Sequence, residues 1–196
     1  ALPEIGAMFH QLMLRLGHTR YAAQGGDWGS FVTAWLGAQR ADHLMGIHLN
    51  LLPLRRDAAM FTNPDEDEKR FLGELELFLK EETGYQAIQG TRPQTLAFAL
   101  SDSPVGLAAW FVEKYRAWTD CDGDPRNALT MDEMLGNISL YWFTNCIGAS
   151  FWPYYARLHD KWPIDGPVTV PTGYCEFPRD ILRPLRRVAL PISSDH

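Results

Sequence analysis

The sequence predicts an α/β fold of about three parallel strands with their helices, interrupted by a mostly helical block. Short runs with strand character occur at residues 21–24, 45–49 and 168–171. From the acidic run at residues 65–68 to about Tyr155, in contrast, the pattern is mostly helical. We therefore expect a core region at residues 1–50, a helical lid at 51–155, and a continuation of the core at 156–196 whose last residues are atypical.

The remaining elements follow from local patterns. Apolar residues recur at helical spacing over residues 4–16, and Gly17 follows them as a candidate C-cap. A second helix is expected at residues 31–39, between the first two strands. The acidic run at residues 65–68 predicts the start of a helix, because carboxylates favour the positive end of a helix.

Composition limits the classes of function. The 196 residues suffice for one compact domain with an insert, and the net charge of −6 argues against binding to nucleic acid or an anionic membrane. No apolar run approaches the ~20 residues that a membrane span needs. The three cysteines show no C-x-x-C spacing, so we expect reduced thiols and a cytoplasmic location rather than a disulfide framework or a zinc site.

The run Gly-Gly-Asp-Trp-Gly-Ser at residues 25–30 lies between a predicted strand and a predicted helix. A nucleophile on a tight strand-to-helix turn needs small residues two positions before and after it, here Gly25 and Gly29, because side chains there would clash. The pattern predicts that Asp27 is a catalytic nucleophile. The alternative is a glycine turn in which Asp27 caps the following helix.

An aspartate in this position indicates a particular chemistry. Its carboxylate is anionic at neutral pH, so it can attack carbon without a base to activate it. Its targets are sp³ carbons that carry a leaving oxygen or halide, and the product is an ester that a water-activating base must hydrolyse. The backbone N–H of Trp28 is the expected oxyanion donor for that second step.

Several runs along the chain carry a resemblance to a known family. They are Gly25–Ser30, Gly84–Tyr85 with Ile88–Pro93, Asp102–Ala109, and Val170–Gly173. In this order, and to about Val188, the sequence resembles the epoxide hydrolases of the α/β-hydrolase superfamily, in the branch that looks like the microsomal enzyme. The resemblance implies a partial α/β-hydrolase core with a helical lid, a small apolar epoxide and water as substrates, and no cofactor or metal. The oligomeric state stays open, with a homo-oligomer as one alternative.

The resemblance also implies roles for individual residues. The family uses two lid tyrosines that hydrogen-bond the epoxide oxygen and protonate it as the ring opens. Tyr85 matches the first of them and Tyr154 the second, with the adjacent Tyr155 as its main competitor. Asp180 matches the charge-relay acid that orients the catalytic base, and Glu176 is the nearest alternative.

Two parts of the family pattern have no counterpart in the sequence. The histidine that activates water would follow a Gly-Gly pair well beyond Asp180, and His196 has no glycines before it. The His-Gly-x-Pro loop that completes the oxyanion hole would precede residue 1. We therefore expect an internal piece of a longer enzyme, or a frameshifted product, that lacks the base and the oxyanion loop.

Two other functions remain open at this stage. A haloalkane or haloacid dehalogenase also uses an Asp-Trp pair on this fold, in which Trp28 would help to bind halide. A non-catalytic truncated fragment that binds apolar ligands is the second alternative.

Overall fold

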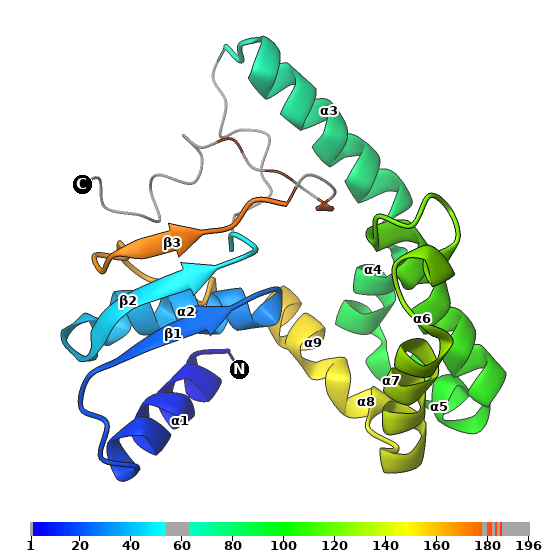
Figure 1. Ribbon diagram of the computed structural model, residues 1–196, viewed down its shortest axis with the longest axis horizontal. Helices are drawn as coiled ribbons and strands as arrows, with labels where there is room; N and C mark the ends of the chain where they lie inside the picture. The colour runs from blue at the N-terminus through cyan, green and yellow to red at the C-terminus, as the bar shows by residue number, and fades with distance from the viewer. Residues whose placement is uncertain (1, 54–62, 178–179, 182, 184, 186–196) are drawn as a thin grey trace. The chain divides into compact units, whose positions relative to one another are not determined.

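The computed structural model describes residues 2–53, 63–177, 180, 181, 183 and 185 (Figure 1). Within these ranges the chain divides into two compact units. The first contains the described parts of residues 1–80, 160–177 and 182–196, and the second contains residues 81–159 with Asp180 and Ile181.

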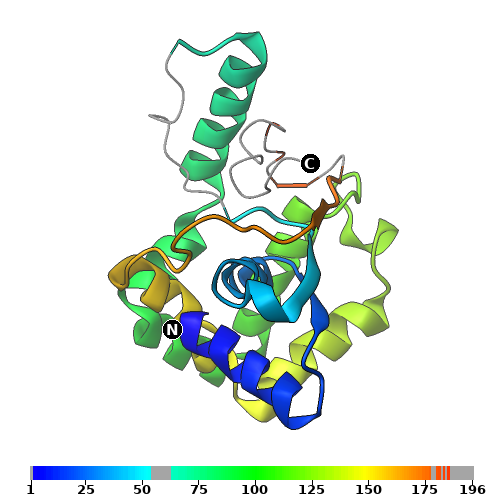
Figure 2. The same cartoon turned by 90° about the vertical axis from the view of Figure 1, so that its left-hand side faces the viewer.

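The first unit is built on a three-stranded parallel sheet in the order β1 (Tyr21–Gly25), β2 (Leu44–Leu49) and β3 (Thr172–Tyr174). Helix α2 (Trp28–Gln39) and the short 3-10 helix η1 (Ala41–His43) connect β1 to β2, and α2 runs along one face of the sheet (Figure 1). Figure 2 looks nearly along the axis of α2. The register pairs Gly25 with Leu49 and Leu49 with Tyr174, so the carboxyl ends of all three strands meet at one edge.

The core of this unit lies between α2 and the sheet. Ala34 of α2 and Leu49 of β2 are fully buried, and the sheet side of α2 is closed by apolar side chains. The buried members of this cluster are Tyr21, Ala34, Trp35, Leu36, Leu44, Ile47, Leu49, Leu52, Val168 and Val170. These findings confirm the predicted α/β class with three parallel strands.

The third strand begins later than the sequence predicts. Residues 168–171 were the expected strand, but the ladder starts at Thr172. The carbonyl of Pro171 accepts a hydrogen bond from the Ile47 N–H at 2.9 Å, while the proline nitrogen has no proton to donate. Val168 and Val170 are buried in the core instead. These valines are apolar because they are buried in the core, and not because they pair in the sheet. The predicted position of the third strand was therefore wrong.

Helix α1 (Leu2–Arg15) is followed by Gly17, which terminates it as predicted. Gly17 has a φ of 85°, and its N–H donates to the carbonyl of Leu14 at 3.0 Å. The N–H of His18 donates to the carbonyl of Met13 at 2.9 Å, which completes a Schellman motif. The glycine therefore ends the helix because it takes up a left-handed conformation that costs other residues energy.

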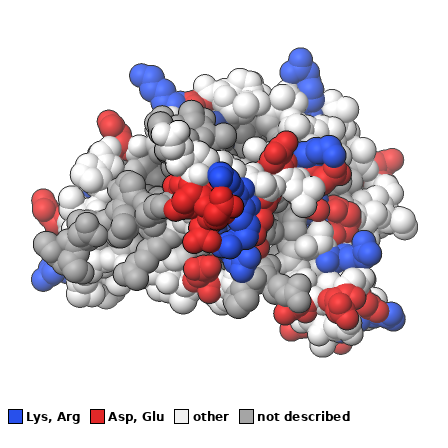
Figure 3. All heavy atoms as spheres, turned by 90° about the horizontal axis from the view of Figure 1, so that it is seen from above, with Lys and Arg blue, Asp and Glu red and all other residues white. Residues whose placement is uncertain are grey.

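Helix α3 (Glu66–Glu81) begins at the acidic run, as expected. Asp65 and Glu68 hydrogen-bond reciprocally, since each backbone N–H donates to the other's carboxylate, at 2.8 and 2.9 Å. Phe71, Leu75 and Phe78 form its buried stripe at helical spacing. In the view of Figure 3, acidic and basic side chains are interspersed over the described atoms, without a continuous area of one sign.

The second unit is helical. Its elements are α4 (Gly84–Thr91), α5 (Pro93–Asp102), α6 (Pro104–Trp118), η3 (Pro125–Asn127), α7 (Met131–Thr144), α8 (Ile147–Ser150) and α9 (Trp152–His159). Leu100, Leu107, Ile138, Ile147 and Phe151 form its buried core. A mostly helical part agrees with the predicted fold class, and the expected lid bounds of residues 51–155 stay a prediction.

The break between α5 and α6 has a local cause. Pro104 occupies the start of α6, and the Ser103 hydroxyl caps that helix by accepting from the Gly106 N–H at 3.0 Å. Among the described residues, no single helix is long and apolar enough to cross a membrane; α5 and α6 reach that length and composition only as a pair, across a bend of 115°.

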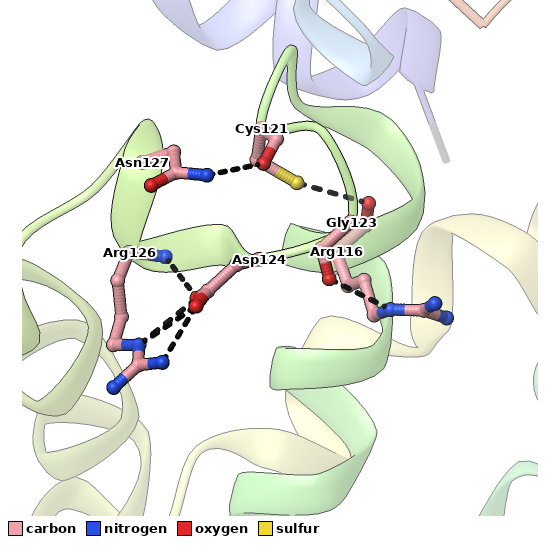
Figure 4. A network of polar contacts seen from close by, with 6 residues as sticks. All are labelled: Arg116, Cys121, Gly123, Asp124, Arg126 and Asn127. Carbon is pink, nitrogen blue, oxygen red and sulfur yellow. Dashed lines mark hydrogen bonds and ion pairs between the residues drawn. The ribbon is translucent and has the colours of Figure 1, made fainter.

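The connection from α6 to α7 is held by polar contacts within the loop (Figure 4). The Asp124 carboxylate accepts from the backbone N–H of Arg126 at 3.0 Å and from its guanidinium at 2.6 Å. Hydrogen bonding to Arg126 lowers the pKa of Asp124 to about 2. The Asn127 amide donates to the Cys121 carbonyl at 3.0 Å, so both sides of the turn are tied down.

Candidate active site

Asp27 occupies the turn between β1 and α2 in an uncommon backbone conformation. Its φ is 46° and its ψ is −124°, a region that residues other than glycine rarely adopt. Ser30, fully buried, donates to the Asp27 carbonyl from its hydroxyl at 2.6 Å and from its N–H at 3.0 Å. The turn is therefore held in a strained shape by the first residues of α2, and such strain is found preferentially at functional sites.

The three glycines of this turn differ in how closely an added Cβ would approach neighbouring atoms. A Cβ on Gly25 would lie 2.2 Å from the carbonyl oxygen of Gly29 and 2.5 Å from the Thr33 hydroxyl. A Cβ on Gly26 would lie 2.4 Å from the side-chain oxygen of Asn50. A Cβ on Gly29 would meet no atom within 4 Å. The expected clash is confirmed for Gly25 and wrong for Gly29, whose backbone, rather than its missing side chain, makes the close contact.

The structure also bears on the alternative in which Asp27 serves as a helix cap. Asp27 occupies the N-cap position of α2, but its side chain makes no capping hydrogen bond. The positive end of the α2 dipole lies at this residue, and Trp28 is the first residue of the helix. An anionic side chain is therefore favoured here without being used as a cap.

Asn50 belongs to the same edge of the sheet, although the sequence analysis did not single it out. Its backbone N–H donates to the Gly25 carbonyl at 3.3 Å, and its side-chain oxygen accepts from the Gln24 amide at 3.1 Å. The available signal was its position directly after β2, because polar residues at the carboxyl ends of parallel strands line the sites of open α/β sheets.

The two predicted lid tyrosines lie together in the second unit. Tyr85 projects from α4 and Tyr154 from α9, and their ring centroids are 5.6 Å apart in an edge-to-face arrangement. The two helices pack closely beside this pair, since a Cβ on Gly90 would lie 3.3 Å from Cδ2 of Leu158 and 3.5 Å from the Tyr154 carbonyl oxygen. The competitor Tyr155 stacks instead on His159, with centroids 4.0 Å apart.

Lys114 supports Tyr85 from α6, and the sequence spacing gave no sign of it. Its ammonium lies 5.3 Å from the centre of the Tyr85 ring and 4.9 Å from that of Trp118. The same ammonium donates to the Glu82 carboxylate at 3.0 Å. Although partial burial disfavours the ammonium, hydrogen bonds to Glu82 and Glu113 raise the pKa of Lys114 above its ordinary value.

Asp180 belongs to the second unit, whereas Asp27 belongs to the first. Partial burial raises the pKa of the Asp180 carboxyl, and the hydrogen bond that it accepts from the Ile181 N–H at 2.8 Å opposes this effect. The alternative acid Glu176 follows β3 and is exposed, and His196 lies outside the described residues. In the described part of the chain, no group of three or more His, Cys, Asp or Glu side chains could hold a metal ion.

No protein-family model matches the chain. A protein of Stigmatella aurantiaca that is provisionally named an epoxide hydrolase is 41% identical over 96% of this chain and 42% of its own length. Epoxide hydrolase 1 of Sus scrofa is 35% identical over 89% of this chain and 44% of its own length. The chain thus spans about two fifths of the length of these curated relatives.

Comparison of the fold with solved structures supports the same family. The structure of Aspergillus niger epoxide hydrolase superposes with a TM-score of 0.80 and 30% sequence identity, and the match covers 98% of this chain and 49% of that one. The shared part has the helix-bearing parallel strands and the helical unit described above. By sequence and by fold, the chain is therefore a relative of the epoxide hydrolases of the α/β-hydrolase superfamily.

Proposed function

We propose that this chain carries the nucleophile and the proton donors of an epoxide hydrolase, which converts an epoxide to a vicinal diol. The observation that carries the proposal is the backbone of Asp27, strained between β1 and α2 in a chain related to epoxide hydrolases. The negative charge of the Asp27 carboxylate is favoured by the positive end of the α2 dipole.

In the first step, the Asp27 carboxylate attacks one epoxide carbon and forms an ester bond as the carbon–oxygen bond of the ring breaks. Tyr85 or Tyr154 gives its phenolic proton to the departing oxygen, which becomes a hydroxyl group. Their edge-to-face contact supports joint action, because two phenols can hold one epoxide oxygen between them. Lys114, above the Tyr85 ring, would stabilise the negative charge that develops as the proton leaves.

In the second step, water hydrolyses the ester, with the Trp28 N–H as one donor to the tetrahedral oxyanion and Asp180 as the acid that orients a histidine base. Four of the five described histidines have other partners, among them His48, whose Nε2 lies 3.3 Å from the Cys175 sulfur. His10 lies 2.8 Å from the Tyr21 hydroxyl, and the rings of His43 and His159 lie 2.8 Å from backbone carbonyl oxygens. We therefore propose that the 196-residue chain forms the ester and hydrolyses it slowly.

The test is intact-mass analysis of the 196-residue protein after incubation with styrene oxide. We expect one added styrene oxide on Asp27, located by peptide mapping, and its absence in Asp27→Asn. Hydroxylamine should release this adduct, because it cleaves esters. A folded wild-type protein that forms no hydroxylamine-labile adduct would refute the assignment of Asp27.

Two further outcomes separate the remaining alternatives. Steady release of diol over many turnovers would contradict the slow second step. Release of halide from a chloroalkane, without reaction with styrene oxide, would favour a dehalogenase.

A further inference from the structure

A cysteine and a histidine that the proposed reaction does not use lie side by side at the ends of β2 and β3. The Nε2 atom of His48 lies 3.3 Å from the sulfur of Cys175. Cys175 is fixed at that point by its backbone, since its N–H extends the ladder by donating to the Leu49 carbonyl at 2.9 Å. The pair is therefore positioned by the hydrogen-bonded ends of β2 and β3.

The strand register explains how the two side chains meet. His48 of β2 pairs with Gly173 of β3, and Cys175 lies two residues further along, on the same face of that chain. A Cβ on Gly173 would lie only 3.1 Å from the Cδ2 atom of His48. The missing side chain thus leaves the space in which the imidazole extends over β3 towards the thiol.

The pair is accessible to small molecules. Cys175 is exposed, and His48 lines a hollow of about 530 Å³ on the sheet face together with Gln24, Thr172 and Gly173. The other two cysteines differ: Cys146 is half-buried, and Cys121 is only 1% exposed, with its thiol directed to the carbonyl of Arg116 at 3.4 Å. All three thiols are free, which provides two internal references for reactivity.

We propose that His48 and Cys175 form a reactive-thiol site that captures electrophilic carbon compounds, epoxides among them, as stable thioethers. The thiolate is the nucleophilic form of cysteine, and a neighbouring imidazole provides a base for it. The thiol proton passes to Nε2 of His48, the sulfur attacks an epoxide carbon, and the ring carbon–oxygen bond breaks. The imidazolium then returns the proton to the alkoxide, so the product is a β-hydroxy thioether and neutral His48 is restored.

This site differs from the Asp27 site in its outcome. An ester on Asp27 can be hydrolysed, whereas a carbon–sulfur thioether is stable to water and to hydroxylamine. Each protein molecule would therefore take up one equivalent at Cys175 and keep it. Exposure of the protein to an epoxide would leave a permanent covalent modification on Cys175, beside β3.

The experiment compares the three cysteines within one protein. The 196-residue chain is treated with a limiting amount of iodoacetamide, and peptide mass spectrometry follows the alkylation of Cys175, Cys146 and Cys121 over time. We expect Cys175 to react at least about tenfold faster than Cys146, because the adjacent imidazole of His48 can accept the thiol proton as the sulfur attacks. In 8 M urea, where the His48 contact is lost, the ratio should approach one. Styrene oxide should give a hydroxylamine-stable adduct on Cys175.

His48→Gln isolates the contribution of the imidazole. We expect this substitution to slow the alkylation of Cys175 by about tenfold, because Cys175 loses its base. The rate of alkylation of Cys146 should stay unchanged. Gly173→Ala, which displaces the ring without removing it, should give a smaller loss. The buried Cys121 reports folding, since its alkylation would reveal an unfolded variant.

Several results would overturn the proposal. Equal native rates at Cys175 and Cys146 would do so without any variant, as would a His48→Gln protein that is folded and reacts at the wild-type rate, because exposure alone would then explain the reactivity. The outcome is distinguishable from that at Asp27: Asp27→Asn should keep the Cys175 thioether, and Cys175→Ser should keep the hydroxylamine-labile ester.

Discussion

Replacing Gly25 by alanine tests whether the turn that presents Asp27 depends on a direct contact between β1 and α2. The added Cβ would be placed 2.2 Å from the Gly29 carbonyl oxygen and 2.5 Å from the Thr33 hydroxyl. Non-bonded heavy atoms prefer separations of about 3.5–4.0 Å, so the overlap exceeds about 1 Å. The atom that must move is backbone at the start of α2, so the strand end and the helix must separate.

The expected loss in the free energy of unfolding follows from that overlap. Extra atoms in a well-packed site typically cost about 1–3 kcal/mol, and we expect Gly25→Ala to reach the upper end, about 3 kcal/mol. Gly29→Ala is the matched control, because its Cβ meets no atom within 4 Å and it lies within α2. Alanine in a helix is favoured over glycine by at most about 1 kcal/mol. The two alanine variants should therefore differ by roughly 3–4 kcal/mol.

Urea titration followed by circular dichroism measures this difference. With a slope of about 1–3 kcal/mol per molar urea, the midpoints of the two variants should differ by at least about 1 M. The wild-type transition must be cooperative for the comparison to hold. If Gly25→Ala unfolds at the same urea concentration as Gly29→Ala, the close contact does not constrain the turn and our reasoning fails.

Three further predictions concern other parts of the fold. Gly17→Ala should cost about 1 kcal/mol through its φ of 85° alone, since the site has open space, and Gly17→Asn should cost less; equal midpoints for wild type and alanine in urea would contradict this. Ser103→Ala should cost about 1 kcal/mol by removing the cap on the Gly106 N–H, and Ser103→Thr should retain most of it; a thermal melt in which both variants match would argue against the cap. Burial lowers the pKa of His10 beside Tyr21 below 6.5, so the unfolded chain takes up the proton first. The free energy of unfolding should therefore be fully retained above pH 6.5 and decrease as the pH falls below it, and an unchanged slope in His10→Gln would exclude this residue as the cause.

Local patterns predicted the elements whose causes are local. Gly17 ends α1 because its left-handed conformation satisfies the last carbonyls, and the acidic run begins α3 because it caps its own backbone. The prediction for β3 failed since the valines at 168 and 170 are apolar for burial in the core. An alternating apolar run alone does not distinguish burial from strand pairing.

In the candidate site, too, some features could be predicted from the sequence and others could not. The glycine-flanked Asp27 could be predicted from sequence because a strand-to-helix turn leaves a short, local signature. The difference between Gly25 and Gly29 could not, since it depends on which atoms of α2 return against the end of β1. The contact of Tyr85 with Tyr154, rather than with Tyr155, likewise depends on the rotation of α9 against α4.

The sequence by itself determined the fold class, the position of the nucleophile candidate and the relationship to epoxide hydrolases. These follow from periodicity and from short motifs, which are written in consecutive residues. Only the tertiary structure decided which distant side chains meet. His48 and Cys175 are 127 positions apart, and Lys114 reaches Tyr85 from another helix. Their contacts depend on strand register and helix packing, which bring together residues that no local spacing connects.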